Sequence, residues 1–167
     1  MNKLLTYRSG SLKDLNQLKQ LGIDTYGQYS TILAPEHWER LNYALHDEKG
    51  LSELLDKSKT FVCVDHELIV GMAYLIPSGN TTDIYQEDRC YIRMVGVHPL
   101  YSGQGIARKL SEMCIEEAKK MNEKTIALHT SEFMDSARHL YASIGFKILK
   151  EIPCRLGKRY WLYTLEI

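Results

Sequence analysis

The stretch that decides the fold is Val95-Gly96-Val97-His98-Pro99-Leu100-Tyr101-Ser102-Gly103-Gln104-Gly105-Ile106-Ala107-Arg108. An apolar run precedes it and apolar residues recur at helical spacing after it, so it predicts a strand that turns into a helix. The first N–H groups of a helix have no partner inside it, and the helix dipole adds positive charge there. Gly103 and Gly105 would let a ligand approach the backbone closely. The turn is therefore suited to hold a phosphate or pyrophosphate, and Arg108 adds a cation nearby.

The same turn lacks two common nucleotide-binding patterns. No Gly-Lys-Ser or Gly-Lys-Thr follows the glycines, so the turn is not a Walker loop. The third glycine of the dinucleotide fingerprint is also missing. From the glycine spacing alone, a structural turn that binds no ligand is as good an interpretation as an anion site.

Periodicity outside this stretch predicts a mixture of helices and strands. Strands are expected at residues 4–8, 61–64, 68–75, 91–97, 125–129, 146–149 and 160–165, and helices at 12–22, 35–55, 105–121 and 137–144. Ser11 and Asp14 predict a capping box before the first helix; Gly22 is expected to end or kink that helix, and Gly50 to break the second. The strand–helix–strand unit from 91 to 129 should be a right-handed parallel crossover. The predicted fold class is α/β, with residues 1–167 forming one domain around a mixed sheet.

Composition and charge narrow the classes of partner. The chain of 167 residues carries 21 basic and 21 acidic side chains, so no net positive field favours nucleic acid or an anionic membrane. Its four cysteines, Cys63, Cys90, Cys114 and Cys154, are far apart and form no Cys-x-x-Cys pair, so no metal site is expected. No apolar run has the length of a signal peptide or a membrane span. We therefore expect a cytoplasmic protein with reduced thiols.

Two motifs carry a resemblance to a known family. Val97-His98-Pro99 is followed by Ser102-Gly103-Gln104-Gly105-Ile106-Ala107, and a second motif reads Ala137-Arg138-His139-Leu140-Tyr141-Ala142-Ser143-Ile144-Gly145-Phe146. In this order, with a strand between them, they resemble the motifs of the GNAT family, the GCN5-related N-acetyltransferases. The order of elements is similar over nearly the whole chain. The resemblance implies a mixed, mostly antiparallel central sheet with splayed parallel strands and flanking helices.

The resemblance also implies that acetyl-CoA binds in the gap between the splayed strands. Val95 and Val97 would pair with the pantetheine arm, and an N–H of the same stretch would polarise the thioester carbonyl. The pyrophosphate would lie on the backbone N–H groups of Ser102, Gly103, Gln104, Gly105, Ile106, Ala107 and Arg108. Ala137, from the second motif, is the remaining cofactor-binding residue that we expect.

Tyr141 matches the family tyrosine that acts as an acid toward the sulfur of CoA. A phenol with a pKa near about 10 is protonated at neutral pH and can donate a proton. Tyr141 also lies on an apolar stripe with Ala137, Leu140 and Ile144, which suits a purely structural core residue. The match to the motif favours the catalytic role.

Three positions depart from the family pattern. Ser102 replaces an Arg or Gln, Met134 replaces an Asn, and Tyr91 stands where many members have a catalytic glutamate. The base is therefore left open among His129, Glu36, Glu87, Asp88, Glu132 and a chain of water molecules. The departures also support an alternative function, a non-catalytic acyl-CoA binding or sensing module of the same fold.

The acceptor is expected to be a primary amine, on a small molecule or on a protein. Tyr26, Tyr29 and Trp38 could bind it, including by cation–π contact, although each suits the core equally well. Direct attack in a ternary complex is preferred to an acyl-enzyme on Cys63 or Cys114, because buried thiols are usually inert. A homodimer is a further expectation, supported by the aromatic residues Tyr160, Trp161 and Tyr163 near the end of the sequence.

Overall fold

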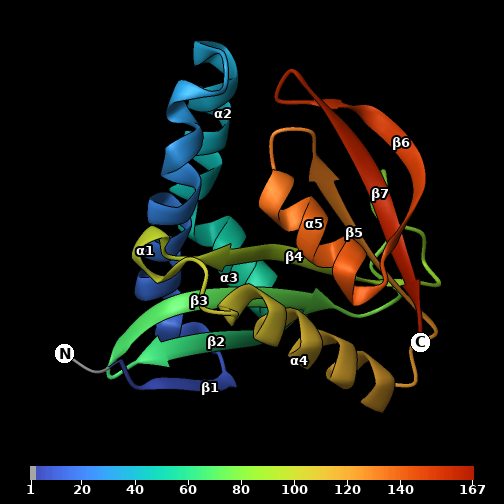
Figure 1. Ribbon diagram of the computed structural model, residues 1–167, viewed down its shortest axis with the longest axis horizontal. Helices are drawn as coiled ribbons and strands as arrows, with labels where there is room; N and C mark the ends of the chain where they lie inside the picture. The colour runs from blue at the N-terminus through green and yellow to red at the C-terminus, as the bar shows by residue number, and fades with distance from the viewer. Residues whose placement is uncertain (1–2) are drawn as a thin grey trace.

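The computed structural model describes residues 3–167 (Figure 1). Over these residues the chain forms a seven-stranded sheet in the order β1-β2-β3-β4-β5-β7-β6. The strands are β1 Leu5–Ser9, β2 Lys59–Asp65, β3 Leu68–Ile76, β4 Cys90–Val97, β5 Thr125–Ser131, β6 Lys147–Arg155 and β7 Lys158–Glu166. The helices are α1 Leu15–Tyr26, α2 Pro35–Leu45, α3 Glu48–Lys57, α4 Ile106–Lys120 and α5 Asp135–Ile144. Short 3-10 turns, η1 Leu12–Asp14, η2 Gly27–Thr31 and η3 Pro99–Tyr101, join some of them.

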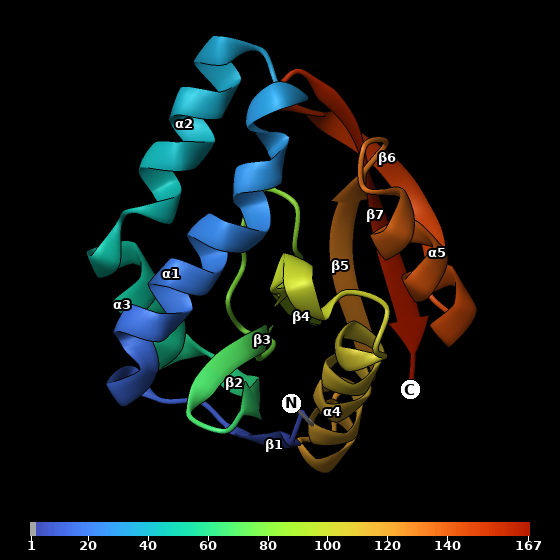
Figure 2. The same cartoon turned by 60° about the vertical axis from the view of Figure 1, so that its left-hand side comes forward.

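The sheet is antiparallel except where β4 meets β5. These two strands run parallel and pair only at Cys90 with Ile126 and at Tyr91 with Ala127. Figure 2 shows α1 to α3 on one side of β4 and β5, and α4 and α5 on the other. The predicted fold class is confirmed, including the splayed parallel strands and the flanking helices.

Two separate apolar clusters hold the helices on opposite faces of the sheet. One joins α4 and α5 to the strands through residues such as Leu110, Leu128 and Phe146. The other joins α1 and α3 to β2 and β3 through residues such as Leu18 and Val62. Because each helix buries one apolar stripe, its position on the sheet is set by that stripe.

A glycine in β3 allows the first turn of α4 to lie close to the sheet. A Cβ on Gly71 would come within 2.6 Å of Ile106 Cγ2 and within 3.0 Å of Leu110 Cδ1. Both of these α4 side chains are buried. The absence of a side chain at residue 71 therefore helps to position the N-terminus of α4 against β3 and β4.

The start of α1 agrees with the predicted capping box, but Gly22 does not end the helix. The Asp14 carboxylate accepts from the Ser11 N–H at 2.9 Å and pairs with Arg8 at 2.9 Å. The helix continues through Gly22 to Tyr26, because the buried Gly22 forms part of the packed face beside Leu45. The expected end or kink at Gly22 was wrong.

The predicted helix from 35 to 55 is two helices, and the break is not at Gly50. Helix α2 ends at Leu45, and Asp47 begins α3 by accepting a hydrogen bond from the Gly50 N–H at 3.0 Å. Gly50 lies inside the first turn of α3. An aspartate that can cap a helix therefore decides the break, whereas the glycine is tolerated within the helix.

Strands β6 and β7 are longer than predicted, and they form one hairpin. Strand β6 extends to Arg155, and its residues are mostly exposed, so apolar periodicity could not reveal its second half. Leu156 and Gly157, with φ values of 51° and 70°, make the turn into β7. Two consecutive positive φ angles are the requirement of a tight hairpin turn.

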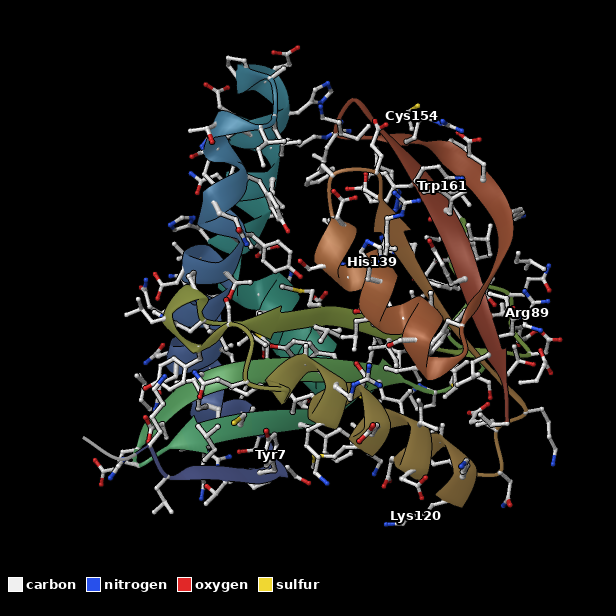
Figure 3. The ribbon with its side chains drawn as sticks, viewed as in Figure 1. Tyr7, Arg89, Lys120, His139, Cys154 and Trp161 are labelled. Carbon is white, nitrogen blue, oxygen red and sulfur yellow. The ribbon has the colours of Figure 1, made fainter. Side chains whose placement is uncertain are left out.

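The aromatic residues of β7 are used inside the chain. Tyr160 and Tyr163 are buried, each about 4% exposed. Trp161, labelled in Figure 3, has the Arg138 and Arg159 guanidinium groups over its ring, at 4.8 and 5.0 Å from the ring centroid. These residues therefore offer little free aromatic surface for the dimer predicted from the sequence. None of the helices in residues 3–167 combines the length and the apolar character that crossing a bilayer requires.

Candidate active site

A cleft opens where β4 and β5 separate. In the pairing of β3 with β4, Met72 lies opposite Gly96 and Tyr74 opposite Arg93, so Met94 and Val95 together face a single residue of β3. This is a β-bulge, and Met94 accordingly has a positive φ of 52°. The bulge begins at Met94, three residues after Tyr91 in the last β4–β5 pair. It bends β4 away from β5 and leaves a cleft of ≈ 1570 Å³ between them.

The N-terminus of α4 forms one wall of this cleft. Gly103 and Gly105 have φ values of 75° and 76°, and residues 102–105 are exposed. Among the described residues no side chain caps the helix. The first backbone hydrogen bond of the helix is donated by the Lys109 N–H to the Gly105 carbonyl, at 3.0 Å. The N–H groups of Ile106, Ala107 and Arg108 precede that bond. These three N–H groups have no partner among the described residues, which is the geometry that an anion site at this turn would require.

Arg108 is directed by a contact with α5. Its guanidinium donates to Ser143 Oγ at 2.6 Å, and that hydroxyl donates to the Leu140 carbonyl at 2.6 Å. The contact links the start of α4 to α5 across the end of the cleft. Arg108 lines the cleft and has no carboxylate partner among residues 3–167, so its charge adds to that of the helix terminus.

Tyr141 lies at the inner end of the cleft. Its ring is 7% exposed and packs edge-on against Phe146, with the ring centroids 5.8 Å apart. Burial raises the pKa of Tyr141, and Tyr26 and Cys114 raise it further, so the phenol is protonated near neutral pH. No residue in the described part of the chain hydrogen-bonds its hydroxyl. Tyr141 is therefore both a core residue and a proton donor that faces a cavity.

The cleft brings together most of the residues expected to form the site. The lining includes Val95, Val97, Ser102, Gly103, Gly105, Ile106, Ala107, Arg108, Ala137, Tyr141, Tyr26 and Tyr29. Within residues 3–167, Gln104 and Trp38 are the two expected residues that do not line it. Gln104 is exposed on the outer side of the turn, and Trp38 lies on α2.

The sequence of the chain matches a known family over residues 19–146, the "Acetyltransferase (GNAT) family". The chain belongs to this family. It is 26% identical to "N-alpha-acetyltransferase 30" of Schizosaccharomyces pombe over 98% of its length and 91% of that protein. It is 32% identical to the "Uncharacterized N-acetyltransferase YjgM" of Escherichia coli, but over only 47% of its length and 45% of that protein.

Solved structures share the fold of this GNAT chain. The PaiA N-acetyltransferase of Thermoplasma acidophilum, solved in complex with coenzyme A, has a TM-score of 0.80 at 14% identity, over 98% of this chain and 99% of that one. The ribosomal-protein-S18-alanine N-acetyltransferase of Escherichia coli has a TM-score of 0.74 at 19% identity, over 98% and 94% of the two chains. The GNAT fold is therefore present from β1 to β7.

An aromatic wall, which the sequence analysis did not predict as a unit, lines the other side of the GNAT cleft. It consists of Tyr26, Tyr29, Phe133, Tyr160 and Tyr85, each of which lines the cleft or contacts a residue that does. Tyr29 and Phe133 meet edge-on at 4.8 Å. Tyr85, Phe133 and Tyr160 come from separate loops and strands, so no spacing along the chain could have grouped them.

His129 is the one base candidate that lines the cleft. Of the five side chains considered, all within the described residues, Glu36, Glu87, Asp88 and Glu132 do not line it. His129 Nδ1 lies 2.5 Å from the Tyr85 hydroxyl. Burial, together with the positive charges of Arg155 and Arg93, lowers the pKa of His129 to about 4. The imidazole is therefore neutral at physiological pH and can accept a proton.

Tyr91, at the position of the usual GNAT glutamate, positions Tyr85. The two rings stack at 3.9 Å with an interplanar angle of 6°, and the Tyr91 hydroxyl donates to the Asn80 carbonyl at 3.3 Å. Residue 91 thus supplies no carboxylate. It instead stacks on the tyrosine that is hydrogen-bonded to His129.

The buried thiols are not placed for covalent catalysis. Burial raises the pKa of the Cys63 and Cys114 thiols, which disfavours the nucleophilic thiolate. Neither side chain lines the cleft in the part of the chain that the structure describes. The described residues also contain no group of three His, Cys, Asp or Glu side chains that could hold a metal ion.

Proposed function

We propose that this chain is an acetyl-CoA-dependent N-acetyltransferase that transfers the acetyl group to a primary amine by direct attack in a ternary complex. The observation that carries the proposal is the free start of α4, at one end of a cleft that leads to the Tyr141 hydroxyl. The N–H groups of Ile106, Ala107 and Arg108 would hold the pyrophosphate of acetyl-CoA. Family membership and the coenzyme A complex of the Thermoplasma relative support the same co-substrate.

The bulge of β4 provides the polar groups for the thioester. Val95 and Val97 line the cleft beyond the last pair with β5. The Val97 carbonyl accepts from the Thr25 hydroxyl at 3.3 Å, so the Val97 N–H and the backbone groups of Val95 are the ones proposed to meet the pantetheine arm. A backbone N–H aimed at the thioester oxygen would stabilise the negative charge that develops on it during attack. This role requires a fixed donor in a site from which water is excluded.

Two proton transfers would accompany the reaction, one from the amine and one to the departing sulfur. The amine nitrogen forms a bond to the acetyl carbon, the C–S bond breaks, and the Tyr141 hydroxyl gives its proton to the departing thiolate. The amine loses its proton to His129, which lines the cleft and whose Nδ1 is hydrogen-bonded to the Tyr85 hydroxyl. Release of the amine's proton from His129 to solvent and return of a proton from solvent to Tyr141 restore the starting state.

The acceptor is proposed to be an amine on a small molecule or a protein. The Schizosaccharomyces relative is named as an N-alpha-acetyltransferase, and the Escherichia coli structure as a ribosomal-protein-alanine N-acetyltransferase. Both names point to amino groups of proteins. The aromatic wall would contact the carbon skeleton of either kind of acceptor.

The test is a turnover assay with acetyl-CoA and a panel of small amines, amino acids and peptides, read out as free thiol. Calorimetric binding of CoA is measured in parallel. Binding of CoA together with thiol release in the presence of at least one amine supports the proposal. Binding without release across the panel would instead favour the non-catalytic acyl-CoA module, for which the lack of a carboxylate at residue 91 is the motivating observation. No binding at millimolar CoA would contradict both functions.

A further inference from the structure

Two polar side chains flank the point at which β4 and β5 separate. Tyr91 and Ala127 form the last pair of the parallel ladder. Side chains two residues apart on a strand point to the same face of the sheet, so Arg93 and His129 lie next along the same face. Both line the cleft. Arg93 is therefore placed beside the base candidate, on the side of the cleft that the aromatic wall forms.

The guanidinium of Arg93 is unpaired. It makes no ion pair and no hydrogen bond with any residue from 3 to 167, and Arg93 is exposed to the cleft. Arg155, the other arginine near His129, is instead held by Asp83 at 3.2 Å. A cation that lines a cleft without a protein partner is a ready site for an anionic group of a ligand.

The charge of Arg93 acts on several groups of the acceptor side. Burial raises the pKa of Tyr26, Tyr85 and Tyr91, and the positive charge of Arg93 opposes that rise in all three. Arg93 also contributes to the low pKa of His129. The guanidinium thus lies close enough to act on residues from α1, β4, β5 and the loop after β3. A group bound there would be next to the proposed base.

The lining of the cleft has more basic than acidic side chains, although the chain has no net charge; two of these bases, Lys19 and Arg155, are paired with Glu48 and Asp83. The lining contains five basic side chains, Lys19, Arg40, Arg93, Arg108 and Arg155, and three acidic ones, Asp47, Asp83 and Asp135. All three acids already have partners. Asp47 caps α3, Asp83 pairs with Arg155, and Asp135 pairs with Arg138. A polycationic acceptor would find no free carboxylate among these.

We infer that Arg93 binds a carboxylate of the acceptor, so that the preferred acceptor is an amine with a carboxylate a few bonds from the nucleophilic nitrogen. The inference rests on the proposed acetyltransferase function. Guanidinium and carboxylate form two parallel hydrogen bonds, which would orient the amine toward the thioester. A nearby cation also lowers the pKa of an amine and so increases the neutral, nucleophilic fraction. The carboxylate could be that of a free amino acid or of an acidic side chain at a peptide N-terminus.

The experiment compares matched acceptors with and without the carboxylate. One pair is L-phenylalanine and L-phenylalaninamide, and the other is the peptide amides Asp-Ala-Ala and Asn-Ala-Ala. The enzyme variants are Arg93→Gln, Arg93→Lys and the control Lys120→Gln. Lys120 is exposed at the far end of α4, away from the cleft (Figure 3). The measured quantity is the ratio of kcat/KM for the carboxylate acceptor to that for its amide, in each variant, because the intrinsic reactivity of each amine cancels between variants.

Arg93→Gln should lower this ratio about 10- to 100-fold for at least one pair, through KM, as expected when a charge-assisted hydrogen bond is lost. Lys120→Gln should leave the ratio unchanged, and Arg93→Lys should lower the ratio less than Arg93→Gln does. The pair that responds identifies the free amino acid or the peptide as the source of the carboxylate. An equal loss for acid and amide, or no loss for either, would overturn the inference while amine acetylation stands. Absence of turnover with every amine, with CoA binding intact, would remove the proposed function and this inference with it.

Discussion

Replacement of Tyr141 by phenylalanine tests the chemistry at the inner end of the cleft. The change removes one hydroxyl and keeps the ring that packs on Phe146. The hydroxyl has no hydrogen-bond partner among residues 3–167, so no internal bond is lost. We expect the free energy of unfolding to change by less than about 1 kcal/mol. The affinity for CoA should also stay within about threefold, because the proposed pyrophosphate site is at the start of α4.

The rate should fall much more than stability or binding. A positioned general acid contributes about 10²- to 10⁴-fold, or roughly 3–5 kcal/mol of transition-state stabilisation. Because burial raises the pKa of Tyr141, its phenol is a proton donor across the usable pH range. We therefore expect kcat to fall at least about 100-fold in Tyr141→Phe, with release of CoA thiol as the assay.

Tyr163→Phe is the matched control. Tyr163 is buried in the same apolar cluster, at 4% exposure, but does not line the cleft in the described part of the chain. The two variants should melt at similar temperatures, and only Tyr141→Phe should lose the rate. If Tyr141→Phe keeps more than about half of the activity, Tyr141 is a packing residue and the proton comes from elsewhere. An equal loss in both variants would point to disturbed packing in place of lost chemistry.

Three further predictions concern the anion site, the buried imidazole and the first cap. Gly105→Ala should weaken CoA binding, whereas the control Gly79→Ala should not. Both glycines have positive φ and no atom within 4 Å of an added Cβ, so both variants bear a similar backbone strain of about 1–2 kcal/mol. Equal CoA affinities of the two variants by calorimetry would exclude the α4 start as the site. Because the folded pKa of His129, about 4, lies below the ordinary 6.5, protonation favours the unfolded chain; its contribution to the free energy of unfolding should therefore rise by about 3 kcal/mol from pH 4 to pH 7. Urea titrations of His129→Gln should lack that increment, and a wild-type slope in the variant would contradict the buried pKa. Asp14→Ala should lose about 1–2 kcal/mol in the same titrations, since it removes the acceptor for the Ser11 N–H; a loss below a few tenths would show that the cap contributes nothing.

The sequence correctly predicted structural features that depend only on residues close together in the chain. The strand-to-helix turn at residues 95–108 and the capping box at Ser11 depend on neighbours in the chain, and both are present. The breaks assigned to Gly22 and Gly50 failed for a related reason. Glycine permits a break but does not require one, and here packing against Leu45 and the cap of Asp47 decide the helices.

Other features could not be predicted because their partners are far apart in the sequence. The bulge at Met94 shows only in the register of β4 against β3. The hydrogen bond of Tyr85 with His129 spans 44 residues, and the ion pair of Arg155 with Asp83 spans 72. The spacing of residues within one helix or strand cannot predict contacts of this kind. The mostly exposed second half of β6 likewise lacks the apolar alternation by which strands are recognised.

The sequence alone determined the family motifs, the α/β order and the glycine-containing turn proposed to bind an anion, because each depends on residues that are adjacent in the chain. Only the tertiary structure decided that the bulge and the short β4–β5 ladder open a cleft, and that Arg93, His129 and Tyr85 meet beside it. The physical reason is that a site of this kind is made by the separation of two strands. Which side chains face the resulting gap depends on register and packing across the whole sheet.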